Sequence, residues 1–295
     1  MDAHVRQLME LPKQHEFFIG FDSDGCVFDS MEIKQKECFC PAFIKHFGLQ
    51  AASKYARETW EFVNLYSKDR GCNRFLAVEK AFALMRQRHQ FAERGVKLAD
   101  TSELSAWIKA ESKLGNPALK KFVAANPTPE MERLLKWSLE VNVRIEEMVF
   151  GIPPFPGVRE VLAAGTGKAD MIVVSQTPLE ALEREWHESG IRGCVGMIAG
   201  QEHGTKTEHL RHAAKDKYAA GKVLMVGDAP GDRKAADGNG ALFFPIIPGR
   251  EEQSWAELAG EGLKRFFAGT FAGQYQHALT EEFEAALPST PHWKN

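Results

Sequence analysis

A short apolar run near the N-terminus constrains the fold of this chain more than any other feature. Residues Phe17–Phe21 are apolar apart from one glycine, and the sequence Asp-Ser-Asp-Gly follows directly at Asp22–Gly25. An apolar run of this length without polar alternation is typical of a strand that is buried on both faces of a parallel sheet. The strand is therefore predicted to deliver two carboxylates at its carboxyl end.

Later apolar runs predict the rest of the sheet. They are Met171–Val174, Val223–Val226, Ala241–Phe244 and a weaker candidate at Cys194–Ala199. Helical patterns separate them, as at Pro178–Ser189 and Thr205–Tyr218. Strands that alternate with helices in this way favour an α/β fold with a doubly wound, Rossmann-like parallel sheet.

Between the first strand and the later ones the pattern becomes almost wholly helical. Apolar residues three or four apart recur there, for example at Phe75, Val78, Phe82 and Met85. The sequence therefore predicts a discontinuous core of residues 1–30 and 154–295, with a helical C-terminal extension, and an inserted all-helical domain at 31–153. The helix-breaking segment Gly151–Gly157 is the predicted hinge.

Composition and charge exclude several classes of function. The net charge is −3, and the absence of a basic run argues against a nucleic-acid partner. No apolar run is long enough for a membrane span, and the N-terminus does not resemble a signal peptide. The five cysteines follow no disulfide or zinc spacing. A cytoplasmic protein is expected, and the sequence leaves open whether it is a monomer or a homodimer.

Polar residues at the predicted strand ends are the candidates for chemistry, because the loops of an open parallel sheet converge outside the carboxyl ends of its strands. They are Asp22 and Asp24 after the first strand, Ser175 after the second, Asp228 and Asp232 after the third, and Lys206 at the start of a helix. Converging carboxylates repel one another unless a cation lies between them, and Mg²⁺ prefers such oxygen ligands.

A magnesium site with an adjacent carboxylate suits phosphoryl transfer. Asp22 is the candidate nucleophile that would form an aspartyl-phosphate, and Asp24 is the candidate acid/base. Ser175 and Lys206 are the candidates for holding phosphate oxygens, and Gln176 is added to them as the neighbour of Ser175. Asp29 and Ser30 are predicted to cap the helix that follows.

Four segments in order along the chain resemble the signature motifs of the haloacid dehalogenase superfamily. They are FDSDGCVFDS, VVSQTP, the TKTEHL segment and VGDAPGDRKAA. The resemblance implies the same catalytic pair, phosphate contacts from Ser175 and Lys206, and a metal site formed by Asp22, the Asp24 carbonyl and Asp228. Asp232 would be a further metal ligand or a carboxylate that supports one. The chain departs from the motif in having Cys26 where threonine is usual.

The insert resembles the mobile helical cap of the subgroup that includes β-phosphoglucomutase and phosphoglycolate phosphatase. Such a lid would set substrate choice, and the candidate substrate contacts in it are Lys34, Arg70, Asn73 and Arg74.

The expected function is Mg²⁺-dependent hydrolysis of a small phosphorylated metabolite through an aspartyl-phosphate. A phosphomutase and a non-catalytic binding or scaffold protein on the same fold are the alternatives. A signalling receiver would also form an aspartyl-phosphate, but the large insert and the two-residue spacing of Asp22 and Asp24 argue against it.

Overall fold

A computed structural model describes residues 3–294 of the chain. The chain forms two compact units. The sheet unit comprises the chain as far as Met31 together with Gly151–Pro288, and the helical unit comprises Glu32–Phe150 together with the residues that follow Pro288. The chain therefore passes between the units at three points.

The sheet unit is built on a parallel sheet with strand order β3-β2-β1-β4-β5. The strands are β1 (Phe17–Phe21), β2 (Ala169–Val174), β3 (Met197–Ala199), β4 (Val223–Gly227) and β5 (Leu242–Pro245). This arrangement confirms the predicted α/β fold. β1 lies at the centre, between β2 and β4, so the carboxyl ends of these three strands lie side by side.

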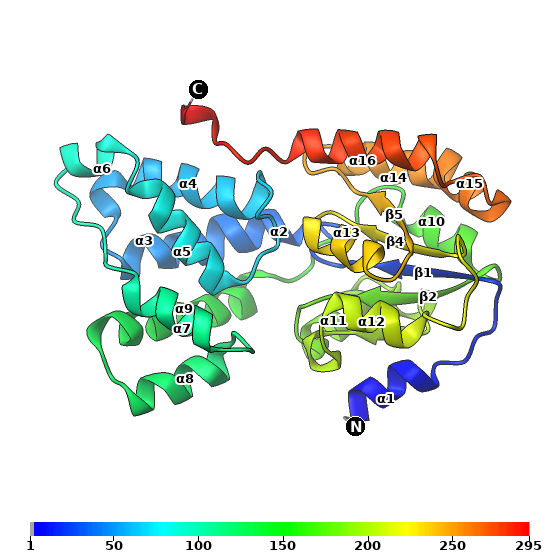
Figure 1. Cartoon of the computed structure of the whole chain (residues 1–295), viewed down its shortest axis with the longest axis horizontal. Coiled ribbons are helices and arrows are strands. Elements are labelled where there is room, and N and C mark those ends of the chain that lie inside the picture. Colours follow the sequence, from blue (N-terminus) through cyan, green and yellow to red (C-terminus); the bar gives the residue numbers. More distant parts are fainter. Residues whose placement is uncertain (1–2, 295) are drawn as a thin grey trace. The chain divides into compact units, whose positions relative to one another are not determined.

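Helices pack on both faces of the sheet (Figure 1). On one face lie α10 (Val158–Gly165), α11 (Leu179–Glu188), α14 (Glu251–Glu257) and α15 (Leu263–Ala268), the last two joined by the π-helical stretch Leu258–Gly262. On the other face lie α1 (Ala3–Glu10), α12 (Lys206–Ala213), α13 (Pro230–Asp237) and α16 (Gln274–Ala286). Every residue of β1 is buried, as expected for a central strand between two layers.

Gly20 in β1 allows α12 to lie close to the sheet. A Cβ atom at this position would lie 3.0 Å from Val174 Cγ2 and 3.2 Å from Leu210 Cδ2 on α12. A larger residue would push the helix outward in a core packed to crystal-like density. Because α12 begins at Lys206, this contact also fixes where the lysine enters the site.

The helix predicted at Thr205–Tyr218 ends early, at Ala213. The helix begins where the sequence predicts, because Thr205 and Glu208 form a reciprocal capping box at its N-terminus. Beyond its end the chain turns, and Asp216 adopts a positive φ of 64° that no α-helix contains. The turn brings the chain back to enter β4.

His209 on α12 is fully buried, with 0% of its surface exposed. Burial lowers its pKa from 6.5 to about 3, and the nearby His203 and Lys206 act in the same direction. The unfolded chain takes up a proton on this ring below pH 6.5, whereas the folded chain stays neutral until about pH 3. The contribution of His209 to stability is therefore complete above pH 6.5 and is lost progressively as the pH falls from 6.5 to 3.

Between pH 7.5 and pH 5.0 we expect the unfolding free energy of wild type to fall by about 2 kcal/mol more than that of the variant His209→Gln, whose side chain stays neutral. Urea unfolding of both proteins at the two pH values measures the difference, in which the titrations of all other groups cancel. An exposed histidine gives the matched control: His277→Gln should follow wild type. Equal losses in wild type and His209→Gln would contradict the prediction.

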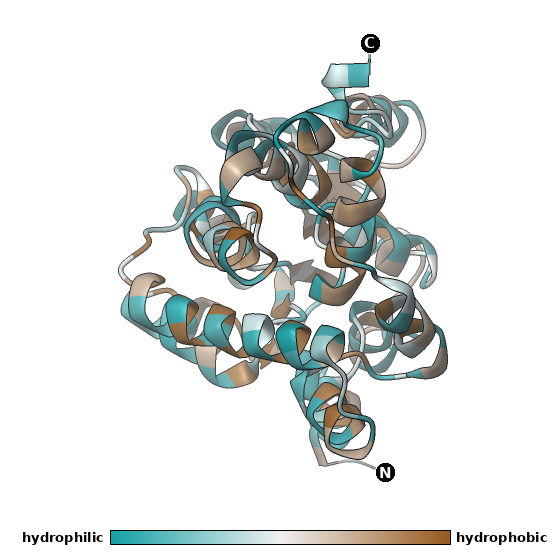
Figure 2. Ribbon diagram, turned by 90° about the vertical axis from the view of Figure 1, so that its left-hand side faces the viewer, coloured by the Kyte–Doolittle hydropathy of each residue, from teal (hydrophilic) through white to brown (hydrophobic). Residues whose placement is uncertain are grey.

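The described part of the helical unit contains helices and no strand. After the short α2 (Ser30–Ile33) and a π-helical stretch at Lys34–Phe39, its helices are α3 (Cys40–His46), α4 (Ser53–Leu65), α5 (Arg74–Met85), α6 (His89–Glu93), α7 (Ser102–Ala110), α8 (Asn116–Ala125) and α9 (Pro129–Met148). Most of these ribbons carry both hydrophilic and hydrophobic segments, as amphipathic helices do (Figure 2). None of the helices within residues 3–294 has the length and apolar character that crossing a membrane requires.

Aromatic residues form the centre of the helical unit. Trp60 packs on Phe43 with ring centroids 4.7 Å apart and on Trp137 at 5.9 Å. The predicted apolar series on α5 is buried throughout. Ser138 lies on α9 between the buried residues Leu134 and Val141, and its hydroxyl donates a hydrogen bond to Asn116 Oδ1 at 2.6 Å. This partner explains how a polar group is accommodated on a buried face.

The last residues of the chain belong to the helical unit, although the sequence had assigned them to the core extension. The Arg88 guanidinium lies over the Trp293 ring, 4.3 Å from its centroid. Phe62 meets the same ring edge-on at 5.5 Å. Because these contacts join helices of the insert to the end of the chain, a local sequence pattern could not have placed this segment.

Candidate active site

A tight loop after β1 sets the positions of its two acidic residues. Asp22 continues the strand, because its N–H donates to the carbonyl of Val226 on β4 at 2.9 Å. The chain then turns at Gly25, whose φ of 76° favours glycine, and the Gly25 N–H donates to the Phe28 carbonyl at 2.8 Å. The Asp22 side chain is buried and that of Asp24 is half-buried.

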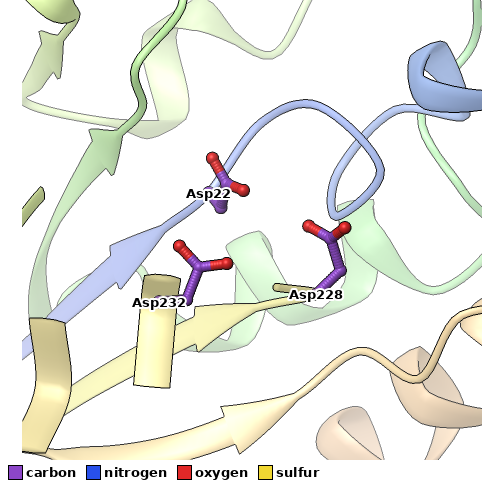
Figure 3. Close-up of side chains that lie close together, drawn as sticks. All are labelled: Asp22, Asp228 and Asp232. Atoms are coloured by element: carbon purple, nitrogen blue, oxygen red, sulfur yellow. The ribbon is translucent and has the colours of Figure 1, made fainter. Parts of the chain in front are cut away.

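Three carboxylates meet at this edge of the sheet (Figure 3). Asp22 ends β1, Asp228 follows β4, and Asp232 lies in the first turn of α13. One oxygen of each lies within 4.8 Å of the others, and all three residues are buried. A cluster of like charges away from water is stable only with a compensating cation or with bound protons.

Gly227 explains how Asp232 reaches this cluster. A Cβ atom at residue 227 would lie only 2.3 Å from Asp232 Cγ, so no other residue fits without moving α13. Asp232 is held there because one of its carboxylate oxygens accepts the N–H of Ala229 at 3.0 Å. The spacing of Gly227, Asp228 and Asp232 is thus required by the geometry of this corner.

Lys206 supplies the positive charge among these carboxylates. Its Nζ lies 2.8 Å from Asp22 Oδ2 and 2.6 Å from Asp232 Oδ1. Burial disfavours the ammonium, but the charges of Asp22 and Asp232 outweigh this effect and hold the pKa of Lys206 above its usual range. The lysine therefore stays charged at neutral pH.

The carboxylates retain excess negative charge despite Lys206. Burial raises the pKa of Asp22 to about 7, against the opposing charge of Lys206 and with a further contribution from Asp228. Burial and the charge of Asp22 raise the pKa of Asp232 to about 6. The three carboxylates form an oxygen donor set that fits a hard divalent cation such as Mg²⁺, and the Lys206 ammonium balances one of their three charges.

Ser175 and Gln176 follow β2 and differ in exposure. Ser175 is buried, and its N–H donates to the Ala199 carbonyl at 2.9 Å. Gln176 is exposed, and its side-chain amide donates to the Gly204 carbonyl at 2.8 Å, just before α12. The sheet places Ser175 at the same edge as Asp22, because β2 pairs with β1. Contact of either residue with phosphate stays a prediction.

Two hydroxyl residues that sequence analysis did not assign to the site contact Asp24. Thr177 Oγ1 donates to Asp24 Oδ2 at 2.6 Å, and Ser30 Oγ donates to Asp24 Oδ1. The sequence pattern predicts Ser30 as a helix cap, and in the SQTP segment it indicates Ser175 and Gln176 but not Thr177. The Thr177 contact spans 153 positions of the sequence, so no local pattern signals it.

The four candidate substrate contacts lie in the helical unit. Lys34 begins its π-helical stretch, and Arg70 donates to the Leu65 carbonyl at 2.9 Å. Asn73 caps α5 by accepting the Phe75 N–H at 3.0 Å. Arg74 donates to Asn142 Oδ1 at 2.7 Å, and burial lowers its pKa to about 10. These contacts give Arg70, Asn73 and Arg74 structural roles; substrate contacts by the four residues stay predictions.

Cys26 does not disturb the loop. Its thiol is fully buried and donates to the Val226 carbonyl at 3.7 Å, and its own carbonyl accepts the indole N–H of Trp255 at 2.9 Å. Burial and the nearby carboxylates, led by Asp228, raise the pKa of this thiol well above its usual value. Cys26 is therefore a neutral packing residue at this position.

Comparisons with known proteins give matches among solved structures alone. Neither the family models nor the curated proteins contain a match to this chain. A protein from Lactobacillus delbrueckii described as a phosphoglycolate phosphatase is 16% identical, with a TM-score of 0.49, over 86% of this chain and 99% of its own. A haloacid dehalogenase-like hydrolase from Streptococcus pneumoniae is 12% identical, with a TM-score of 0.46, over 85% and 98%.

A third similar structure is the magnesium-bound hydrolase YfnB of Bacillus subtilis, which is 13% identical with a TM-score of 0.44. The match covers 84% of this chain and all of that one. The descriptions of the Streptococcus pneumoniae and Bacillus subtilis proteins name the superfamily that the four sequence motifs resemble. The function proposed below rests on the geometry of the site and not on these similarities.

Proposed function

We propose that this protein is a Mg²⁺-dependent phosphatase that hydrolyses a small phosphorylated metabolite through an aspartyl-phosphate on Asp22. One observation carries the proposal. The buried carboxylates Asp22, Asp228 and Asp232 meet around Lys206 at the carboxyl edge of a parallel sheet, with Asp24 two residues from Asp22. This arrangement combines a nucleophile, an acid/base and a cation site, which phosphoryl transfer requires.

Asp22, Asp228 and Asp232 would hold the magnesium ion, and the resemblance adds the backbone carbonyl of Asp24. When bound, the ion would offset the carboxylate charges and the negative charge on the phosphate oxygens. The raised pKa values of Asp22 and Asp232 support this assignment, because burial makes their ionised forms costly and a bound cation would offset that cost.

In the first step a carboxylate oxygen of Asp22 forms a bond to phosphorus while the bond from phosphorus to the leaving oxygen breaks. Asp24 gives its proton to that leaving oxygen. In the second step Asp24 takes a proton from a water molecule as the water oxygen attacks phosphorus. The bond from phosphorus to Asp22 then breaks, which releases inorganic phosphate and restores both residues.

Lys206, Ser175 and Gln176 would hold the phosphate oxygens. Lys206 contributes a full positive charge beside the nucleophile, at 2.8 Å from Asp22 Oδ2. Hydrogen bonds from charged donors to phosphate are shorter and stronger than those from neutral donors. Lys206 is thus the residue expected to contribute most to phosphate binding.

The helical unit would act as a cap that sets substrate choice, with Lys34, Arg70, Asn73 and Arg74 as its candidate contacts. A lid that excludes water strengthens the electrostatic interactions inside a site. A small metabolite in the cytoplasm suits such a lid, and the net charge of −3 gives no general attraction for nucleic acid.

Phosphate release from a panel of phosphorylated metabolites tests the proposal. We expect wild type to release phosphate from at least one compound with Mg²⁺ and to lose this activity in excess chelator. Activity should return when Mg²⁺ is added beyond the chelator. Release that persists in chelator would contradict the metal site. No release from any compound would contradict the phosphatase, and transfer of phosphate between two positions of a sugar would identify a mutase.

A further inference from the structure

Asp24 is held by hydroxyl groups on both of its carboxylate oxygens. Thr177 Oγ1 donates to Oδ2 at 2.6 Å, and Ser30 Oγ donates to Oδ1. Thr177 comes from the loop after β2, whereas Asp24 lies in the loop after β1. The Thr177 hydrogen bond therefore joins two loops of the sheet unit at the place where the proposed proton transfer occurs.

We propose that Thr177 is a positioning residue, which orients the Asp24 carboxyl group for proton transfer to the leaving oxygen. The inference rests on the proposed function and adds a residue to its machinery. Thr177 acts through Asp24 and needs no contact with the substrate.

The backbone of Thr177 is fixed on both sides, so its hydroxyl has a defined position. Its N–H donates to Ser175 Oγ at 3.2 Å, and its carbonyl accepts the Gln201 N–H at 3.1 Å. The next residue, Pro178, restricts Thr177 to extended conformations. These constraints let one hydroxyl orient a carboxyl group on another loop.

Gly200 shows how tightly this loop is packed. A Cβ atom there would lie 2.8 Å from the carbonyl oxygen of Thr177 and 2.8 Å from the Leu179 nitrogen. The segment that holds Thr177 thus has little freedom to move away from Asp24.

The need for such positioning follows from the exposure of Asp24. Its side chain is half-buried, whereas Asp22 is buried and bonded to Lys206. A half-exposed aspartate on a turn has several rotamers, and proton transfer requires the one within hydrogen-bond reach of the leaving oxygen. Each carboxylate oxygen has two lone pairs, so a bond from Thr177 leaves room for a second partner.

The Thr177→Val variant keeps the shape of the side chain and removes the hydrogen bond, and Thr177→Ser keeps the hydroxyl. Two substrates separate the acid role from simple loop support. p-Nitrophenol leaves readily without protonation, whereas phenol needs a proton from the general acid. Phosphate release from p-nitrophenyl phosphate and from phenyl phosphate is measured for wild type and both variants. The values of kcat and KM are determined for each protein with each substrate.

We expect Thr177→Val to lower kcat for phenyl phosphate about tenfold or more, and for p-nitrophenyl phosphate by less than about threefold. KM should change little for either substrate. Thr177→Ser should recover most of the phenyl phosphate activity. The matched control Thr270→Val, an exposed threonine of the same unit, should equal wild type.

Equal losses on the two substrates, an effect on KM alone, or unchanged or higher activity would overturn the role of Thr177 while leaving the phosphatase intact. A lack of rescue by serine would also overturn it, provided that circular dichroism shows both variants folded. Wild type that releases phosphate neither from these two compounds nor from any member of the metabolite panel would contradict the proposed function and, with it, this inference.

Discussion

Asp22→Asn is expected to lower phosphate release by about 10³-fold or more while the protein remains folded. The change keeps the size of the side chain and replaces the nucleophilic carboxylate with a neutral amide, whose oxygen is a poor nucleophile. Loss of a residue that forms the covalent intermediate removes nearly all of the catalysis that depends on it. Initial rates at saturating Mg²⁺, with the best substrate of the panel, measure the effect.

The stability of the same variant separates a catalytic role from a structural one. Asp22 lies among like charges in a buried site, where burial raises its pKa to about 7. The raised pKa means that the cost of burying this carboxylate outweighs its ion pair with Lys206, so with a neutral residue in its place the melting temperature without metal should stay constant or rise. A variant that is both inactive and unfolded would leave a structural role as the better explanation.

The matched control is the same change, aspartate to asparagine, at a position outside the carboxylate cluster. Asp237 is exposed on α13, the helix that carries Asp232, so Asp237→Asn should keep activity within about twofold of wild type. Mass spectrometry of wild type quenched during turnover should detect one added phosphoryl group on the peptide that contains Asp22. Retained turnover in Asp22→Asn would exclude this residue as the nucleophile.

Lys206→Met is expected to give the second large effect, on stability as well as on activity. The substitution removes the ammonium that lies 2.8 Å from Asp22 and 2.6 Å from Asp232, and three buried carboxylates lose their balancing charge. Breaking a buried ion pair by removing one partner costs about 3–5 kcal/mol. We expect about 3 kcal/mol at pH 7, because the carboxylates can take up protons in place of the lost charge.

A divalent cation should restore part of the lost stability, since it would supply positive charge to the same carboxylates. Thermal unfolding with and without Mg²⁺ measures this directly and needs no substrate. The rise in melting temperature caused by Mg²⁺ should be larger in Lys206→Met than in wild type. Catalysis should nevertheless fall about 10²-fold or more, because the phosphate contact is lost.

Arg211→Met is the matched control, because it removes an exposed cation from the same helix. Its stability and its response to Mg²⁺ should equal those of wild type. If Lys206→Met responds to Mg²⁺ no more than Arg211→Met does, the carboxylates do not bind the ion where we propose.

Much of the sheet could be predicted because its pattern is local. An apolar run such as Phe17–Phe21 does not alternate between core and water, and its short length favours a strand covered on both faces, as the structure has it. The helical period of Phe75, Val78, Phe82 and Met85 is local in the same way, and all four are buried. Because the strands are parallel, their carboxyl ends lie at the same edge of the sheet, and this brings Asp22 near Asp228.

Interactions between distant segments could not be predicted from such patterns. Thr177 and Asp24 are 153 positions apart, and they meet because β1 and β2 are neighbours in the sheet. The end of α12 at Ala213 was missed because the apolar pattern continues into the turn that contains Asp216.

The sequence by itself determined the α/β class, the order of the strands along the chain and the types of residue at the strand ends, because burial and periodicity act over a few neighbouring positions. The tertiary structure alone decided the distances from Lys206 to Asp22 and Asp232, the raised pKa of Asp22, and the placement of Trp293 against Arg88. These properties depend on charges and packing surfaces that meet only after folding. The physical reason is that electrostatic and packing energies depend on separation in space, which separation along the chain does not specify.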